Sequence, residues 1–210
     1  DSVVTKTAPW GDSVEHLPKH YYLNGLGDIT EEQMMAIYNA GKMTSTTPIA
    51  LYKQTAIRTT ISALLSGGEG EKVNLYYICS YAQSMEVFRA TKSSMLTTSR
   101  IANAFDNCTK LKYIVPILKI DSITGSYNIA NAFKACRELV LCKLYNLKIS
   151  TSFSNSPLLS KESILYTIQN AAPTSEITIT LHADAYARLE KDADIVAALA
   201  AQPLVTLVSA

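Results

Sequence analysis

The stretch Ile101-Ala102-Asn103-Ala104-Phe105 recurs unchanged as Ile129-Ala130-Asn131-Ala132-Phe133, 28 residues further along the chain. A cysteine follows each phenylalanine by three residues, and a leucine follows each cysteine by three more; the pairs are Cys108 with Leu111 and Cys136 with Leu139. Identity over five consecutive residues indicates an internal repeat, and such repeats decide the architecture of a chain. The repeated pattern is F-x-x-C-x-x-L.

Weaker copies of this pattern flank the two central units. The upstream copy consists of Tyr81, Ser84 and Val87, and the downstream copy of Phe153, Ser156 and Leu159. The four aromatic residues are therefore 24, 28 and 20 residues apart. Each unit predicts one turn of a coil whose inward side chains stack on those of the next turn, because a single turn cannot bury its own apolar side chains. The expected ladder consists of Tyr81, Val87, Phe105, Cys108, Leu111, Phe133, Cys136, Leu139, Phe153 and Leu159.

A strand is expected directly after each repeat leucine. Leu139, Cys142 and Leu144 fit the spacing L-x-x-L-x-L, whereas Pro116 takes the third place after Leu111 and ends that strand, because proline cannot donate to a ladder. The outward positions beside these strands form a basic and aromatic surface that fits either a ligand or a neighbouring subunit. The candidate ligand-binding residues are Phe88, Arg89, Lys112, Tyr113, Val115, Leu141 and Lys143.

Helix and strand patterns flank the repeats on both sides. Thr30 predicts the N-cap of a helix that ends at Ala40, and Ser160 predicts the N-cap of a second helix. After it, the sequence predicts a strand over 177–181, one helical stretch over 183–201 and a final strand over 204–208. We expect three regions within one continuous structural domain: an N-terminal lead-in over 1–46, repeats over 47–159 and a C-terminal α/β cap over 160–210.

The two F-x-x-C-x-x-L units resemble the BspA-like class of leucine-rich repeats. The segments 159–164 and 177–182 are similar to sequences that close such repeat proteins in gut bacteria, and 25–30 resembles their usual lead-in. The resemblance implies an α/β fold: an irregular leucine-rich-repeat solenoid (a right-handed β-α superhelix) with an N-terminal helix and a C-terminal helix-strand capping unit. It also implies a bacterial cell-surface or extracellular location and an adhesive role. Related proteins in phage-like genomic settings imply a virion-like particle as the alternative location.

Composition argues against two classes of partner. Lys and Arg number 19 against 18 Asp and Glu, and a net charge of +1 creates no global field toward nucleic acid or anionic lipid. The apolar runs are far shorter than the ~20 residues that a membrane span needs. We therefore expect no nucleic-acid partner and no transmembrane segment.

Residue types that carry chemistry are present without the arrangements that chemistry needs. Cys108, Cys136 and Cys142 lie at inward repeat positions, and no histidine lies at a matching position to act as a base. His16 and His20 have the spacing of a helical zinc site, but Pro18 between them favours a polar loop. The segment 67–72 lacks the phosphate-loop pattern and is expected to be a turn. We expect no enzymatic activity, no metal and no cofactor.

Two functional hypotheses follow. In the first, the chain is an adhesin-like binding module that contacts protein or glycan through its repeat sheet. In the second, it is a structural component of a phage-like or surface assembly and forms homo-oligomers. The second rests on the apolar C-terminal region, with Leu199 and the strand over 204–208.

Overall fold

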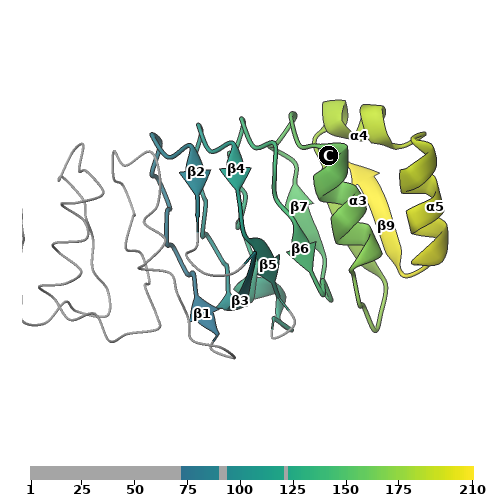
Figure 1. The fold of residues 1–210 in the computed structure, drawn as a ribbon, viewed down its shortest axis with the longest axis horizontal. Helices are drawn as coiled ribbons and strands as arrows, with labels where there is room; N and C mark the ends of the chain where they lie inside the picture. The colour runs from purple at the N-terminus through teal and green to yellow at the C-terminus, as the bar shows by residue number, and fades with distance from the viewer. Residues whose placement is uncertain (1–71, 90–93, 121–122) are drawn as a thin grey trace, which may run out of the picture.

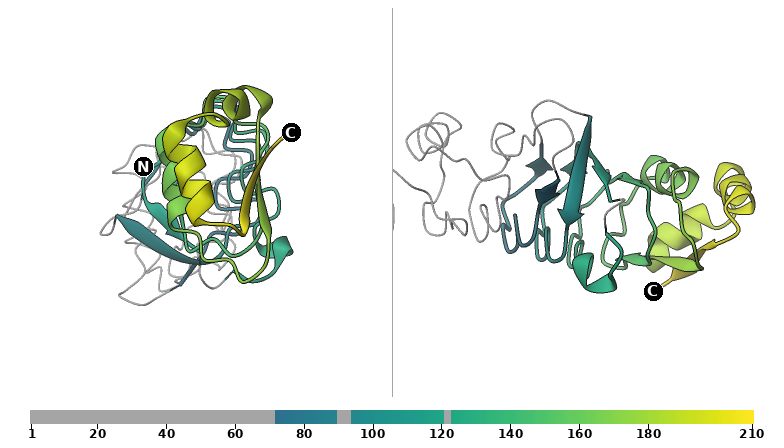
Figure 2. Two further views of the ribbon diagram at one scale, coloured as in Figure 1. Left: turned by 90° about the vertical axis from the view of Figure 1, so that its right-hand side faces the viewer. Right: turned by 90° about the horizontal axis from the view of Figure 1, so that it is seen from below.

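The structure, a computed structural model, describes residues 72–89, 94–120 and 123–210. The expected helix over 30–40, the two N-terminal histidines and the glycines at 67, 68 and 70 lie outside these residues. The described chain is a mixed α/β structure with several small sheets in which every strand pair is parallel. Figures 1 and 2 show successive turns of chain lying side by side along the long axis, with the helices at the C-terminal end.

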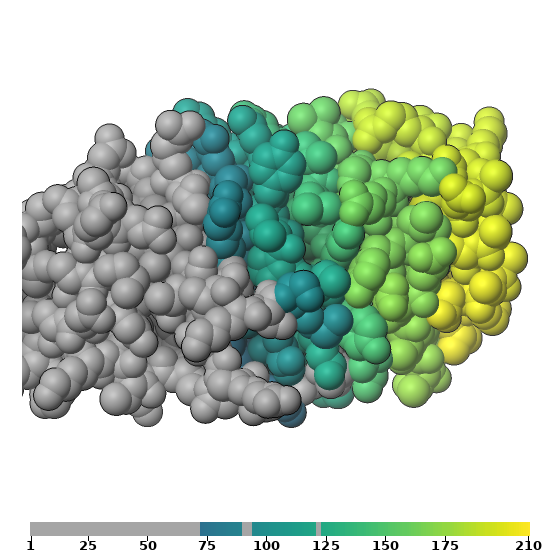
Figure 3. Space-filling view, in the orientation of Figure 1, coloured from purple at the N-terminus to yellow at the C-terminus, as the bar shows by residue number. Residues whose placement is uncertain are grey.

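Two sets of short strands form the sides of these turns. A four-stranded sheet has the order β1-β3-β5-β6, and a two-stranded sheet pairs β2 with β4. Successive colours form successive bands in Figure 3, so segments close in sequence stay close in space. The bounds are β1 Val73–Asn74, β2 Val87–Phe88, β3 Met95–Arg100, β4 Tyr113–Ile114, β5 Ile117–Lys119 and β6 Leu144–Tyr145, with a short 3-10 helix, η2, at Ser126–Asn128.

Backbone hydrogen bonds between turns define the true repeat. We call residues 75–88, 101–114, 129–142 and 149–160 turns 1 to 4. Amides at alternate positions of one turn donate to carbonyls of the next, as when Cys79 N donates to Ala104 O (2.8 Å) and Phe105 N donates to Ala132 O (3.0 Å). These bonds align turn 1 with turn 2 at a separation of 26 residues and turn 2 with turn 3 at 28, since 105 − 79 = 26 and 133 − 105 = 28.

The first unit therefore has a different register from the one expected. Tyr81 is 45% exposed and Val87 is only partly buried, so neither belongs to the inner ladder. The inward residues of turn 1 at the aromatic, cysteine and leucine places are Cys79, Ala82 and Met85, each 0% exposed. The expected pattern failed because turn 1 has no aromatic side chain at the aromatic place.

Phenylalanine rings form a continuous stack through the core. Phe105 and Phe133 are stacked with ring centroids 6.0 Å apart, and Phe133 and Phe153 are stacked at 4.6 Å. At the other end, Phe88 packs edge-on against Phe105 at 4.9 Å. Phe88 lies six residues after the cysteine place, so turn 1 supplies its ring from a different position. Such contacts stabilise the core beyond the burial of apolar area alone.

The cysteine place is a polar ladder as well as an apolar one. The Cys108 thiol donates to Cys79 O (2.9 Å) and the Cys136 thiol donates to Phe105 O (3.1 Å). In turn 4, the Ser156 hydroxyl donates to Cys136 O (3.0 Å). The place requires a side chain small enough to be buried and able to donate, because an unpaired buried carbonyl costs free energy.

Left-handed backbone recurs at two places of each turn. The residues before and after the aromatic place have positive φ: Tyr77, Asn103 and Asn131 at one place (55°, 53° and 54°), and Tyr81, Asn107 and Ala135 at the other (60°, 58° and 58°). Asparagine tolerates this conformation better than other residues with a Cβ atom. The repeated N in the sequence therefore marks a backbone requirement of the turn.

The C-terminal unit closes the stack. β7, β8 and β9 form a parallel sheet in that order, and helices α3, α4 and α5 accompany it (Figure 1). Ser160 is the N-cap of α3, which confirms the prediction. The single helix expected over 183–201 is wrong: Asp192 caps a separate helix and accepts from Asp194 N and Ile195 N. The bounds are β7 Thr151–Phe153, α3 Lys161–Gln169, β8 Ile177–Leu181, α4 Ala183–Leu189, α5 Ala193–Ala201 and β9 Val205–Ser209.

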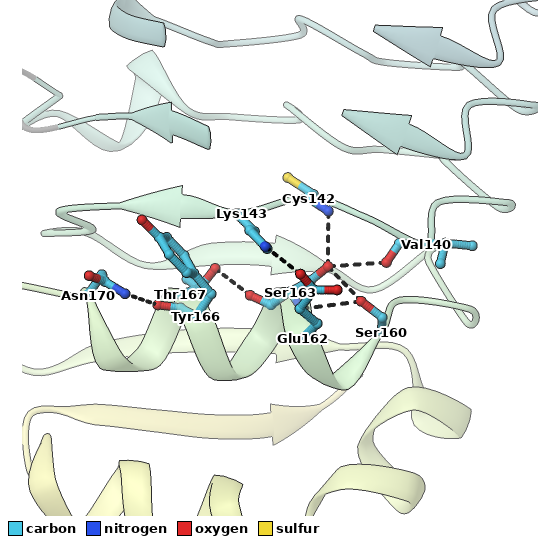
Figure 4. Close-up of polar contacts among 9 residues, drawn as sticks. All are labelled: Val140, Cys142, Lys143, Ser160, Glu162, Ser163, Tyr166, Thr167 and Asn170. Carbon is cyan, nitrogen blue, oxygen red and sulfur yellow. Dashed lines mark hydrogen bonds and ion pairs between the residues drawn. The ribbon is translucent and has the colours of Figure 1, made fainter. Parts of the chain in front are cut away.

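Helix α3 ends the strand ladder with side-chain hydroxyls (Figure 4). In the preceding turn, Ile114 N and Leu118 N donate to backbone carbonyls, those of Leu141 and Lys143. The equivalent amides one turn later, Cys142 N and Leu144 N, donate to Ser163 Oγ (3.0 Å) and Thr167 Oγ1 (3.1 Å).

The spacing explains why a helix can replace a strand there. Four helical residues rise ~6.0 Å, and two strand residues rise ~6.6 Å. Hydroxyls on successive helical turns therefore match alternate amides of the strand. Each hydroxyl also donates, Ser163 Oγ to Val140 O (3.1 Å) and Thr167 Oγ1 to Ser163 O (2.8 Å), so both are satisfied.

The left-handed place at Ala135 yields a prediction with opposite signs for two similar substitutions. Ala135→Gly should raise the free energy of unfolding by about 1 kcal/mol, because glycine adopts positive φ without a Cβ penalty. Ala130→Gly, outside the left-handed region, should lower it by ~0.5–1 kcal/mol. Urea unfolding of both variants checks this, and the same sign for both would contradict it.

The hydroxyls of α3 yield a second prediction. Thr167→Val should lower the free energy of unfolding by ~1–3 kcal/mol, because the buried Leu144 amide loses its acceptor. The matched control is Thr178→Val in β8, whose hydroxyl bonds none of the residues that the structure describes. Thermal and urea unfolding should show a change within ~0.5 kcal/mol for the control. Equal effects would show that the Thr167 hydroxyl does not cap the ladder.

Candidate functional site

The outward positions of β2, β4 and residue 141 form one continuous surface. Val87 pairs with Tyr113, and Tyr113 forms a parallel bridge with Leu141, so the three side chains lie in a row across turns 1 to 3. A second row follows two residues later, because alternate strand residues share a face. We call this surface the outer face; it consists of Val87, Arg89, Lys112, Tyr113, Val115, Leu141 and Lys143.

The centre of the outer face is apolar and exposed. Tyr113 is 42% exposed and Val115 is 51% exposed, while Leu141 is half-buried. Large apolar side chains with this exposure on adjacent positions favour a contact with another molecule over a solvated surface. Six of the seven candidate residues thus lie on the face for which they were proposed.

Phe88 does not lie there, and its assignment to the outward surface is wrong. Its side chain is 0% exposed, and the residue pairs with the buried Ile114 in the register of β2 and β4. The physical reason is the register of turn 1: Phe88 aligns with Ile114 and Cys142, which both point into the core. Val87, which the sequence placed in the ladder, takes the outward position instead.

Two lysines of the outer face are engaged in ion pairs. Lys112 Nζ lies 3.7 Å from Glu138 Oε2, and Lys143 Nζ lies 2.5 Å from Glu162 Oε1. Lys143 Nζ also lies 5.4 Å from the centre of the Tyr166 ring of α3, beside the hydroxyls of the cap (Figure 4). The rim of the face is therefore polar and locally neutral, and helix α3 extends it beyond the last strand.

The four cysteines are buried, and their environment keeps them protonated. Burial raises the pKa of each thiol, Cys79, Cys108, Cys136 and Cys142, because an apolar core disfavours the thiolate. The Cys79 and Cys136 pKa values rise further through the neighbouring cysteine side chains. These thiols act as hydrogen-bond donors within the ladder.

The described histidine has a structural place. His182 is the N-cap of α4, and its Nδ1 accepts from Asp184 N (3.1 Å). Within residues 72–89, 94–120 and 123–210, no three His, Cys, Asp or Glu side chains form a group that could hold a metal ion. No helix in the same ranges is long and apolar enough to cross a membrane.

A second surface was not anticipated from the sequence. A groove with a volume of about 650 Å³ lies between turn 3 and turn 4, and its walls carry Tyr127, Asn131, Lys134, Ser152, Asn155 and Thr180. Tyr127 is 67% exposed, the most exposed of the large apolar or aromatic side chains described. The density of Ser and Asn over 150–156 could have drawn attention to turn 4, but the opposite wall comes from residues about 20 positions earlier.

Comparisons of the chain with protein-family models, with curated proteins and with solved structures find no match. The geometry of the chain itself therefore carries the functional argument.

The raised thiol pKa values predict a loss of stability in alkaline solution. A thiol that stays neutral in the folded state and ionises in the unfolded state contributes stability that is complete below its unfolded pKa of ~8.5 and lost as the pH rises. Each such thiol should lower the free energy of unfolding by ~1.4 kcal/mol per pH unit above that value.

Urea unfolding at several pH values from neutral to alkaline measures this slope. Cys142→Ala should reduce the slope by the share of one thiol, whatever its effect at neutral pH. A variant slope equal to that of the unsubstituted chain would contradict the assignment.

Proposed function

We propose that the chain is a non-catalytic binding module, an irregular leucine-rich-repeat solenoid of the BspA-like class whose outer face contacts a protein. One observation carries the proposal: Tyr113 and Val115 are exposed at the centre of a surface that three stacked turns build together. A face made by several turns can be extended or altered by changing outward residues without disturbing the inward ladder.

The chemistry of the face favours a protein over other partners. Protein interfaces have a core depleted in charge, enriched in aromatic residues and surrounded by a polar rim. The outer face follows this pattern, with Tyr113 and Val115 inside and the pairs Lys112–Glu138 and Lys143–Glu162 at the border. Nucleic acid would need unpaired cations to neutralise phosphates, and both of these lysines already face carboxylates.

The repeat pattern supports the location and role that the resemblance implies. The F-x-x-C-x-x-L units at Phe105 and Phe133 occupy equivalent places in adjacent hydrogen-bonded turns. The described part of turns 1 to 3 contains strands and η2 but no α-helix, so an irregular member of the class fits better than a regular β-α superhelix. On this basis we propose an adhesive role at a bacterial cell surface.

A second candidate function is a structural part of an assembly. β9 forms one edge of its sheet, and Val196 of α5 (50% exposed) and Leu204 (37% exposed) are exposed near it. Strand edges pair readily with another chain. Val205 and Leu207 of β9 are already buried within the chain, which leaves little apolar surface for a subunit contact and makes this the weaker candidate.

One set of variants tests the proposed function. Tyr113→Ser and Val115→Ser should each weaken binding about fivefold to thirtyfold, the loss typical of an anchor residue at the centre of an interface. Val196→Ser is the matched control, because Val196 and Val115 are the same residue type with 50% and 51% exposure. The measurement is biolayer interferometry of the full chain against purified cell-surface and matrix proteins.

The same variants distinguish the two functions. Sedimentation velocity reports self-association, which Val196→Ser should not alter if the outer face is the site. An absence of binding across the panel, or a loss with Val196→Ser equal to that with Val115→Ser, would contradict the proposal. Self-association abolished by Val196→Ser alone would establish the assembly instead.

A further inference from the structure

The groove between turns 3 and 4 lies where the backbone ladder between turns is interrupted. From turn 2 to turn 3 the ladder is complete: Asn103 N donates to Ala130 O (2.9 Å) and Phe105 N donates to Ala132 O (3.0 Å). The equivalent donors of turn 3, Asn131 N and Phe133 N, make no backbone bond to turn 4 within the part of the chain that the structure describes. Their missing acceptors, by the same alignment, are the carbonyls of turn 4.

The interruption has a structural cause. Turn 4 contributes β7 to the sheet with β8 and β9, so its backbone is paired on the far side rather than with turn 3. In the core the two turns remain in contact, since the Phe133 and Phe153 rings are stacked at 4.6 Å. The turns therefore separate toward the surface, and the groove is the opening between them.

Two amide side chains on opposite walls are held in fixed orientations. Asn131 Nδ2 donates to Asn103 Oδ1 (3.2 Å), and Asn155 Oδ1 accepts from Ala135 N (3.1 Å). The remaining atoms, Asn131 Oδ1 and Asn155 Nδ2, have no further partner among the described residues. One wall thus keeps a free acceptor and the other a free donor, with little orientational freedom to lose when they bind.

An aromatic platform flanks these amides. The Tyr127 ring lies over Gly125 so closely that a Cβ atom there would be 2.6 Å from the ring. The guanidinium of Arg100 lies 6.0 Å from the ring centre and stacks on Tyr76 at 3.6 Å. Contacts on both sides fix the position of the ring, yet 67% of the residue stays exposed.

The lining chemistry selects the class of ligand. Hydroxyls and amides dominate the described lining, no carboxylate is among it, and Lys134 is its single charged residue. One cation is too few for a phosphate-rich ligand, and polar walls disfavour an apolar one. Vicinal hydroxyls of a sugar both donate and accept, which suits the free amide atoms, and the C–H face of a pyranose ring suits the negative face of an aromatic ring.

We propose that this groove binds a neutral oligosaccharide, with Tyr127 as the stacking platform and Asn131 and Asn155 as the hydroxyl contacts. The volume of about 650 Å³ lies within the ~300–1,000 Å³ typical of small-ligand sites. The free amides of Asn131 and Phe133 on the groove wall add two backbone donors. This site is built by parts of turns 3 and 4 that do not contribute to the outer face, so it does not depend on the proposed protein contact.

The test is a glycan array carrying neutral, sialylated and sulfated glycans, followed by calorimetric titration of the full chain with the neutral oligosaccharide that gives the strongest signal. Tyr127→Ala should weaken binding about tenfold or more, which corresponds to ~1.4 kcal/mol. Asn155→Asp should weaken it similarly, because the carboxylate still accepts from Ala135 N but the free donor is gone. Gly125→Ala should also weaken binding, because the new methyl group displaces the Tyr127 ring.

The matched control is Tyr113→Ala, which removes an exposed tyrosine from the outer face and should leave the affinity unchanged. Urea unfolding of each variant verifies that the fold is intact. No neutral glycan bound at millimolar concentration, or equal affinity in the Tyr127→Ala and Asn155→Asp variants, would overturn the proposal. Binding confined to sialylated or sulfated glycans would overturn the assignment of a neutral ligand.

Discussion

The hydrogen-bonded stacking of one turn on the next is the constraint on which the rest of the structure depends. A single turn of about 26 residues exposes most of its apolar side chains, and only its neighbours can cover them. The backbone bonds set the register, and the register decides which side chains become the core. The phenylalanine stack, the thiol ladder and the left-handed places all recur because each turn must present the same surfaces to the turns on both sides.

A structure built in this way must end somewhere, and the two ends of the described ladder show how. On the strand side, α3 substitutes the Ser163 and Thr167 hydroxyls for the carbonyls of an absent strand. On the side of the aromatic place nothing substitutes, because β7 has joined the C-terminal sheet. The first solution leaves no polar group unpaired. The second leaves backbone donors at the surface, and the polar groove is its consequence.

The two candidate surfaces follow from these two sides of the turn. The outer face is a product of repetition, since the same outward place in three turns carries Val87, Tyr113 and Leu141. The groove is a product of the break in repetition. A repeat protein can therefore carry a broad apolar contact and a narrower polar site on the same few turns without either disturbing the core.

The sequence by itself determined the central part of this structure. The repeated IANAF segments identified two equivalent turns and the inward direction of Phe105 and Phe133, and Ser160 identified the start of the closing helix, because periodic burial and N-capping leave local patterns. Only the tertiary structure decided the register of turn 1, where Phe88 supplies the core ring while Cys79 occupies the aromatic place. It also decided where the ladder opens and which walls meet there. Those features depend on backbone pairing between residues 20 to 28 positions apart, and no local pattern of side chains records which amides find an acceptor.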